Sequence, residues 1–142
     1  TVILVGEEDA INEIQEIVED EGYIVIRENQ QDFLFLNSLK SKIDVILLKG
    51  NNFKLSVQGI AIKEKAFVDL YYAVTRLEYA ISIPELSRIF NNMRRNKTYT
   101  PLRMKQAAVD RGVENEINWL LGLKKLHPKV LEFMEYQLKE HI

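Results

Sequence analysis

The chain has 142 residues, the size of one ordinary domain, and we predict a single domain over residues 1–142. Hydrophobic residues at 46% and charged residues at 28% are usual for globular proteins, and no apolar run approaches the ~20 residues of a membrane helix. The lack of cysteine excludes a disulfide framework and thiolate metal sites, and no signal-peptide pattern is present. We therefore expect a cytoplasmic protein with no membrane partner.

The net charge is −2, but the charged residues are unevenly distributed along the chain. Residues 7–21 contain eight acidic residues and no Lys or Arg. Residues 88–111 contain seven Lys or Arg and one Asp, a local charge of +6. The acidic stretch fits a solvated helix face near a helix N-terminus, with a basic partner as the alternative. The basic stretch is a candidate contact surface.

The first part of the chain predicts alternating strand and helix. Residues 2–5 are an apolar run closed by Gly6, which indicates a buried strand. Asp9 can cap a helix with one apolar stripe, and Gly22 ends it. Residues 23–26 predict a second strand. This order indicates a right-handed crossover with parallel pairing.

A hairpin is predicted next. Residues 33–40 fit either a short strand or the start of a helix, and both stay open. Residues 43–48 predict a clear strand, and residues 54–58 a shorter one with alternating apolar side chains. The turn signal Asn51-Asn52 lies between them.

The stretch 59–80 predicts a long central helix that begins near Ile62 or Lys63. Little of its surface is polar, so neighbouring elements must cover most of it. The side chains expected to be nearly fully buried are Phe67, Leu70, Tyr71 and Val74.

Later segments are wholly helical. Ser82 and Glu85 can form a capping box around Pro84, and Pro101 and Gly112 mark the start and end of another helix. The helices predicted after residue 80 cover 84–95, 101–111, 114–125 and a last one that opens at Pro128. The predicted fold class is α/β (α+β): a small mixed sheet within residues 1–58, packed on the central helix, and a helical half over residues 59–142.

Catalytic patterns are missing from the sequence. His127 and His141 are the only histidines, and no glycine-rich phosphate loop is present. Asp44 begins a strand that carries no second carboxylate for a metal ion. We therefore predict no catalytic residue, no metal site and no cofactor.

Two groups of residues remain as candidate sites. Lys65 and Asp69 are four residues apart and can pair, while Glu64 lies in the first helical turn, where a negative charge is favoured. Helix capping with an ion pair would leave Lys65 and Asp69 exposed, whereas an enzyme site would place all three in a cleft. The second group is the basic set, a candidate contact for nucleic acid or a partner: Arg88, Arg94, Arg95, Lys97, Arg103, Lys105 and Arg111.

Three motifs resemble the C-terminal domain of AbiEi-like proteins, the antitoxins and transcriptional regulators of abortive-infection toxin–antitoxin systems. They are an E-K-x-x-x-D segment at residues 64–69, an E-L-x-x-I-F helix at residues 85–90, and residues 102–112, which stand where that family has an L-x-x-x-A-x-x-R-G helix. The resemblance covers roughly residues 2–121.

The resemblance implies a non-enzymatic antitoxin or regulator paired with a nucleotidyltransferase-like toxin. Members of the family commonly carry an N-terminal winged helix that binds operator DNA, whereas this chain begins at once with the strand at residues 2–5. We expect either a fragment or a member without that DNA reader, which leaves toxin binding or auxiliary contact with the DNA backbone.

Two alternatives stay open. Residues 84–95 and 101–111 could form a helix-turn-helix with Arg103, Lys105 and Gln106 facing a groove of DNA. An uncharacterised enzyme using Glu64, Lys65 and Asp69 is the third hypothesis.

Overall fold

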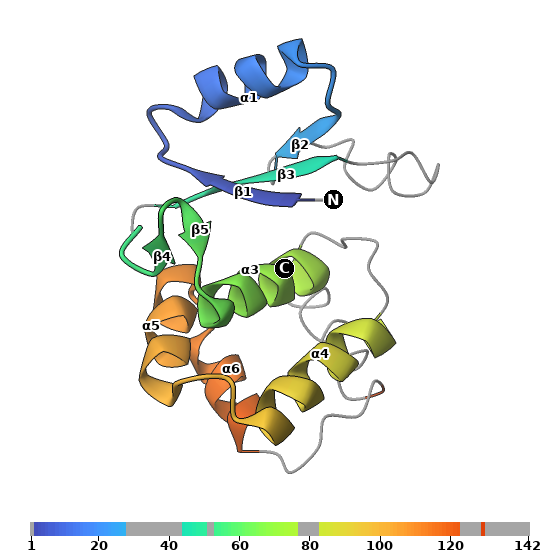
Figure 1. Ribbon diagram of the computed structural model, residues 1–142, viewed down its shortest axis with the longest axis vertical. Coiled ribbons are helices and arrows are strands. Elements are labelled where there is room, and N and C mark those ends of the chain that lie inside the picture. The colour runs from blue at the N-terminus through green and yellow to red at the C-terminus, as the bar shows by residue number, and fades with distance from the viewer. Residues whose placement is uncertain (1, 28–43, 51–52, 77–82, 123–128, 130–142) are drawn as a thin grey trace. The chain divides into compact units, whose positions relative to one another are not determined.

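The structure is a computed structural model that describes residues 2–27, 44–50, 53–76, 83–122 and 129 (Figure 1). Its contacts divide the chain into two compact units, Thr1–Phe53 and Lys54–Ile142. The fold class is mixed α/β with a helical C-terminal half, as predicted. That residues 1–142 form one domain stays a prediction.

Unit 1 contains a three-stranded parallel sheet built from β1 (Val2–Gly6), β2 (Val25–Arg27) and β3 (Val45–Lys49). β3 is the central strand and pairs on either side with β1 and β2. The four residues 45–48 are all buried, which is typical of a strand covered on both faces of a parallel sheet. The predicted parallel orientation of the first two strands is confirmed, but β3 lies between them.

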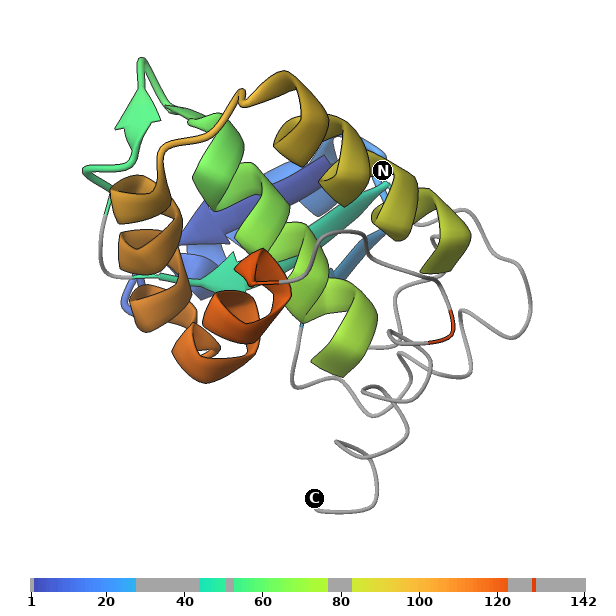
Figure 2. The ribbon, with the colours of Figure 1, turned by 90° about the horizontal axis from the view of Figure 1, so that it is seen from below.

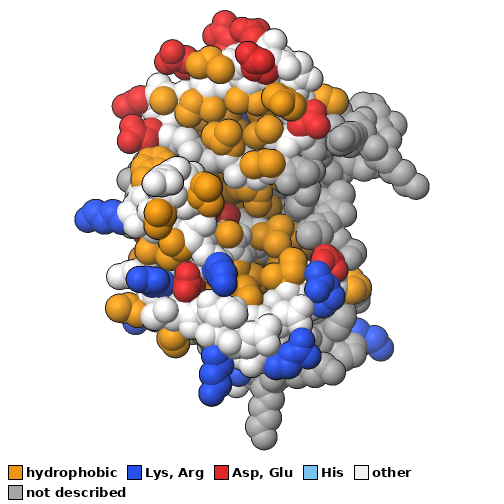
Figure 3. Space-filling model, viewed as in Figure 1, with side chains coloured by type: hydrophobic (Ala, Val, Ile, Leu, Met, Phe, Trp, Pro, Cys, Tyr) orange, Lys and Arg blue, Asp and Glu red, His pale blue; other side chains and the backbone are white. Residues whose placement is uncertain are grey.

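Helix α1 (Ile11–Asp20) packs on this sheet through a small apolar core. Gly6 allows the close approach, because a Cβ atom there would lie 2.6 Å from Cδ1 of Ile14. Figure 3 shows Asp and Glu side chains gathered over this helix, as expected for its solvated face. The core of unit 1 consists of Ile11, Val25, Val45 and Leu47, with Leu4, Ile14 and Val18 packed against it.

Unit 2 begins with a tight hairpin within residues 56–61. The hairpin predicted between residues 43–48 and 54–58 is wrong. β4 (Ser56–Val57) pairs antiparallel with β5 (Ile60–Ala61). The central residues Gln58 and Gly59 have φ of 53° and 80°, the positive values that a two-residue type I′ turn requires. The apolar run 43–48 was expected to pair with 54–58, but it supplies β3, where continuous apolar character suits a sheet interior. The proposed turn Asn51-Asn52 lies outside the described residues.

The described part of unit 2 also contains the helices α3 (Lys63–Arg76), α4 (Ile83–Asn96), α5 (Pro101–Arg111) and α6 (Glu114–Leu121). Figure 2 shows α3 running between α4 on one side and α5 and α6 on the other. Among the described residues, no helix is long and apolar enough to cross a membrane.

The core of unit 2 forms around α3. The expected burial is confirmed for Phe67, Tyr71 and Val74, while Leu70 is half-buried against the same core. The rings of Phe67 and Phe90 pack with centroids 5.5 Å apart. The other helices contribute Leu86, Met104, Ala107, Ala108, Ile117 and Leu120 to this core.

Helices α4 and α5 end in the same left-handed cap. After α5, Gly112 has φ of 71°, and the N–H of Val113 donates to the Ala108 carbonyl at 2.9 Å. After α4, Lys97 has φ of 51°, and the N–H of Thr98 donates to the carbonyl five residues before it at 3.1 Å. Lys97 therefore adopts a conformation that favours glycine.

These two caps generate opposite predictions. Lys97→Gly should raise the free energy of unfolding by about 0.5–1 kcal/mol, because glycine adopts the left-handed conformation without strain. The gain is smaller than the strain itself, because glycine loses more conformational entropy on folding than lysine does. Gly112→Ala should lower it by about 1–2 kcal/mol for the converse reason. Urea unfolding followed by the fluorescence of the single tryptophan, Trp119, measures both. A stabilised Gly112→Ala variant would contradict the cap assignment.

Candidate functional site

Asp69 is the centre of a buried ion-pair group. Its carboxylate is 3% exposed and accepts from Lys65 Nζ at 2.8 Å and from Arg111 Nε at 2.7 Å. The Arg111 guanidinium also lies over the Tyr72 ring, 5.5 Å from its centroid. The predicted pairing of Lys65 with Asp69 is present, but neither residue is exposed as the ion-pair alternative required, and Arg111 from the last turn of α5 bonds Asp69.

Glu64 has a separate structural partner. It is 5% exposed, and its Oε1 accepts from the backbone N–H of Thr100 at 3.0 Å. This bond holds the connection between α4 and α5 on the first turn of α3. The three residues of the predicted motif thus act at two points, both of which join α3 to α5.

A second buried polar group was missed by the sequence analysis. Tyr71 Oη donates to Glu116 Oε1 at 2.7 Å, and the Arg76 guanidinium donates to both carboxylate oxygens of Glu116. Burial raises the pKa of the Tyr71 hydroxyl far above its usual range, and the hydrogen bond to Glu116 adds to this effect. Arg76 and Glu116 are 40 residues apart, so no local sequence pattern could predict their pairing.

Three residues of the basic set are balanced by acids. Arg111 pairs with Asp69, as described above. Arg88 donates through Nε to Glu85 Oε2 at 3.0 Å on the surface of α4. Lys105 Nζ lies 3.7 Å from Glu114. The local charge of +6 therefore overstates what this region presents to a partner.

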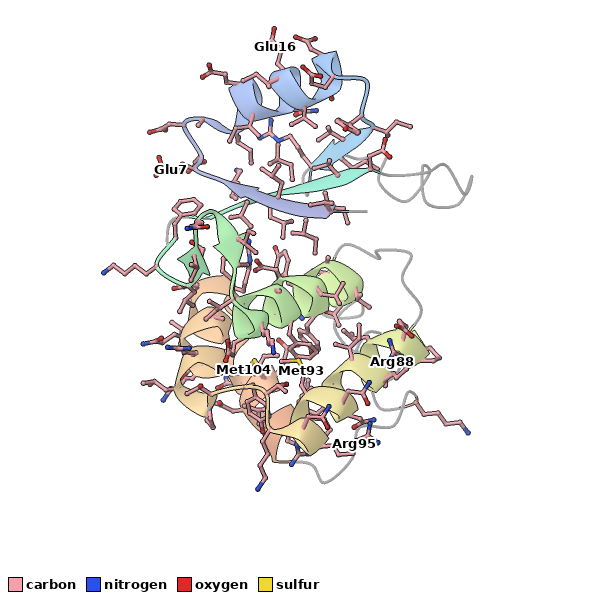
Figure 4. All side chains as sticks on the ribbon, viewed as in Figure 1. Glu7, Glu16, Arg88, Met93, Arg95 and Met104 are labelled. Atoms are coloured by element: carbon pink, nitrogen blue, oxygen red, sulfur yellow. The ribbon has the colours of Figure 1, made fainter. Side chains whose placement is uncertain are left out.

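Arg94 is held against the protein. Its guanidinium lies 5.8 Å from the centroid of the Phe90 ring, and its Nη1 is buried without a hydrogen-bond partner. The side chain is half-buried, so Arg94 is not among the cations that α4 presents to solvent. Figure 4 shows Arg88 and Arg95 toward the outside of α4, where both are exposed, and Met93 and Met104 toward the interior of unit 2.

Lys63, Arg95, Lys97 and Arg103 are exposed and lie within 4 Å of no described carboxylate, and we call them the open cations. Lys63 was not singled out from the sequence, because it lies 25 residues before the basic stretch. The open cations come from the last turn of α4, the connection to α5, and the first turns of α5 and α3. The bond between Glu64 and Thr100 holds these segments together.

A groove opens beside the open cations. It has a volume of about 560 Å³ and is bounded by the β4–β5 hairpin, the start of α3, the α4–α5 connection and the start of α5. Lys63 and Arg103 line it together with Thr98 and Thr100, and Glu64 belongs to the same lining. Lys65 and Asp69 are not among the lining residues, so the three motif residues do not share this groove.

The remaining carboxylate candidate also has a structural role. Asp44 Oδ2 accepts from the backbone N–H of Ile24 at 2.8 Å, next to the start of β2. Within the part of the chain that the structure describes, no group of three or more His, Asp or Glu side chains is placed to hold a metal ion. His127 and His141 lie outside the described residues.

Comparison with protein-family models, with curated proteins and with solved structures finds no match for this chain. The resemblance to AbiEi-like proteins therefore depends on the three motifs alone and stays a prediction. Two of these motifs meet in the structure, because Asp69 of the first bonds Arg111 of the third.

The buried ion pairs can be tested directly. Asp69→Asn should lower the free energy of unfolding by about 3–5 kcal/mol, because it leaves two cations buried without their counter-charge. Glu85→Gln is the matched control, since it breaks an exposed pair with Arg88 on one helix and should change stability little. Equal effects of the two substitutions in urea unfolding would contradict a central role for Asp69.

Acid should act on the group around Glu116. Burial alone raises the pKa of this carboxyl, but hydrogen bonds from Arg76 and Tyr71 outweigh burial and hold the pKa below its ordinary value of 4.5. A pKa that is lower in the folded state stabilises the fold at neutral pH, and this contribution is lost as the pH falls below about 4.5.

We therefore expect the free energy of unfolding to fall more steeply between about pH 5 and pH 3 in the wild type than in Glu116→Gln. Urea unfolding at a series of pH values, followed by Trp119 fluorescence, measures both slopes. Parallel profiles would show that Glu116 does not couple protonation to folding.

Proposed function

We propose that the chain is a non-enzymatic binding domain of the antitoxin or regulator type, and that unit 2 contacts the nucleic-acid backbone through the open cations. The observation that carries the proposal is that Lys63, Arg95, Lys97 and Arg103 are exposed and that no described carboxylate pairs with them. Lys and Arg side chains of this kind replace the counterions that condense on phosphates, which drives association.

The neighbouring polar side chains support a phosphate-bearing partner. Thr98 and Thr100 line the groove beside Lys63 and Arg103, and Asn92 accepts from Arg95 at 2.8 Å and orients it. Threonine, asparagine and basic side chains together are the usual donors to phosphate oxygens. A surface of this composition favours backbone contact over the reading of bases.

The contacts of Glu64, Lys65 and Asp69 favour a role in stability over catalysis. Glu64 and Asp69 bond other segments of unit 2, Lys65 pairs with Asp69 within α3, and Lys65 and Asp69 lie outside the groove. The helix-turn-helix alternative has less support, because α5 packs mainly against α3 and α6, and Lys105 pairs with Glu114. A nucleotidyltransferase-like toxin remains the partner implied by the family resemblance.

Binding should be non-specific in sequence and sensitive to salt. With three or four phosphate contacts, the logarithm of affinity should fall with the logarithm of salt concentration with a slope of about −3. The triple variant Arg95→Gln, Lys97→Gln, Arg103→Gln should reduce the slope to about −1, since only Lys63 remains. Titration of labelled duplexes of several lengths at two salt concentrations gives these values.

The matched control removes three cations that are already paired, through Arg88→Gln, Lys105→Gln and Lys49→Gln. We expect it to keep most of the wild-type slope. An absence of binding to duplexes and to single strands at low salt would refute nucleic-acid contact. Saturable binding of one acidic protein, independent of DNA length, would then assign the open cations to a toxin.

A further inference from the structure

We propose that the groove beside the hairpin receives one unpaired nucleotide of a single strand, with its phosphate between Lys63 and Arg103 and its base against the hairpin. This inference rests on the proposed contact with nucleic acid and adds a specific site to it. Its ligand is a nucleoside phosphate, whether part of a strand or free.

The two cations approach the groove from different helices. Lys63 is the first residue of α3, and Arg103 lies in the first turn of α5. Thr98 and Thr100, which also line the groove, carry hydroxyl groups that can donate to phosphate oxygens. The bond from the Thr100 N–H to Glu64 fixes this side of the groove before any ligand arrives. The backbone segments that carry these donors are therefore held side by side, and the exposed side chains of Lys63 and Arg103 can turn toward a phosphate.

The hairpin supplies an apolar wall. Val57 and Ile60 are direct cross-strand partners, and they are 66% and 74% exposed. The base of the hairpin is anchored, because the Ile62 N–H donates to the Leu55 carbonyl at 3.0 Å and Leu55 belongs to the core of unit 2. An exposed apolar pair on an anchored hairpin beside two cations suits a ligand with one anionic end and one flat apolar end.

Glu64 decides where the phosphate lies. Its carboxylate is part of the groove lining and is almost completely buried, with Oε1 occupied by the Thr100 N–H. Its negative charge disfavours a phosphate close to it and places the phosphate toward Lys63 and Arg103.

The groove is open to solvent and has room for one nucleotide. Its volume of about 560 Å³ lies within the roughly 300–1,000 Å³ that small-ligand sites occupy. A base within a duplex is stacked and paired, so it reaches such a groove only after being unstacked. A single strand presents its bases at much lower cost, so we expect the groove to distinguish single strands from duplexes.

The test compares a labelled 12-nucleotide single strand with the duplex of the same sequence, by fluorescence anisotropy on the full chain. Ile60→Ala should weaken binding of the single strand about threefold to tenfold and leave duplex binding unchanged, since only the apolar contact with the base is reduced. Val109→Ala is the control, because Val109 is also exposed but does not line the groove. Val57→Ala serves as a second variant of the hairpin.

Competition identifies the ligand chemistry. A nucleoside monophosphate should displace the strand from the wild type and less well from Ile60→Ala, whereas inorganic phosphate should compete weakly. Equal competition by inorganic phosphate would overturn the proposal, because the base would contribute nothing. A poly-glutamate peptide that competes with the same dependence on Ile60 would overturn it in favour of a protein partner.

The two proposals fail in different ways. If neither duplexes nor single strands bind at low salt, nucleic-acid contact by the open cations is refuted. If duplexes bind with the expected salt dependence but Ile60→Ala and Val57→Ala change no affinity for single strands, only the nucleotide site is refuted.

Discussion

The buried carboxylate of Asp69 is the constraint on which the arrangement of unit 2 depends. A carboxylate removed from water costs several kcal/mol unless its charge is compensated. Lys65 compensates it within α3, and Arg111 does so from the end of α5. At the start of α5, the Thr100 N–H bonds Glu64 on α3. Helix α5 is therefore tied to α3 at both ends, and sliding along α3 would expose or unpair charges at both points.

This attachment also builds the proposed binding surface. Because the start of α5 is held on the first turn of α3, Arg103 and Lys63 line one groove although 40 positions separate them in the sequence. The hairpin, anchored through Leu55, closes the other side. The first motif, Glu64, Lys65 and Asp69, thus holds parts of unit 2 in place. The proposed contact with a partner uses the open cations instead.

The cations of unit 2 fall into two groups: some stabilise the fold, and others are exposed on the surface. Arg111 and Arg76 are largely buried and bond carboxylates on neighbouring elements, where they join helices. Arg95, Lys97 and Arg103 are exposed and available to solvent or a partner. Lys97 combines exposure with a left-handed backbone, so its place at the end of α4 carries a cost in stability. Lys97 belongs to the proposed cationic surface. In that proposal, a glycine at this cap would remove one of the charges that contact the partner.

The sequence by itself determined the elements whose signals are local. Pro101 and Gly112 bound α5, and the apolar periodicity of α3 predicted the burial of Phe67 and Tyr71, because capping and helical periodicity depend on residues a few positions apart. The tertiary structure decided which distant segments meet. It paired β3 with β1 and β2 in place of the predicted hairpin, and it brought Arg111 to Asp69 across 42 positions. Such partners are selected by packing and by the cost of burying charge, and neither is visible in a short stretch of sequence.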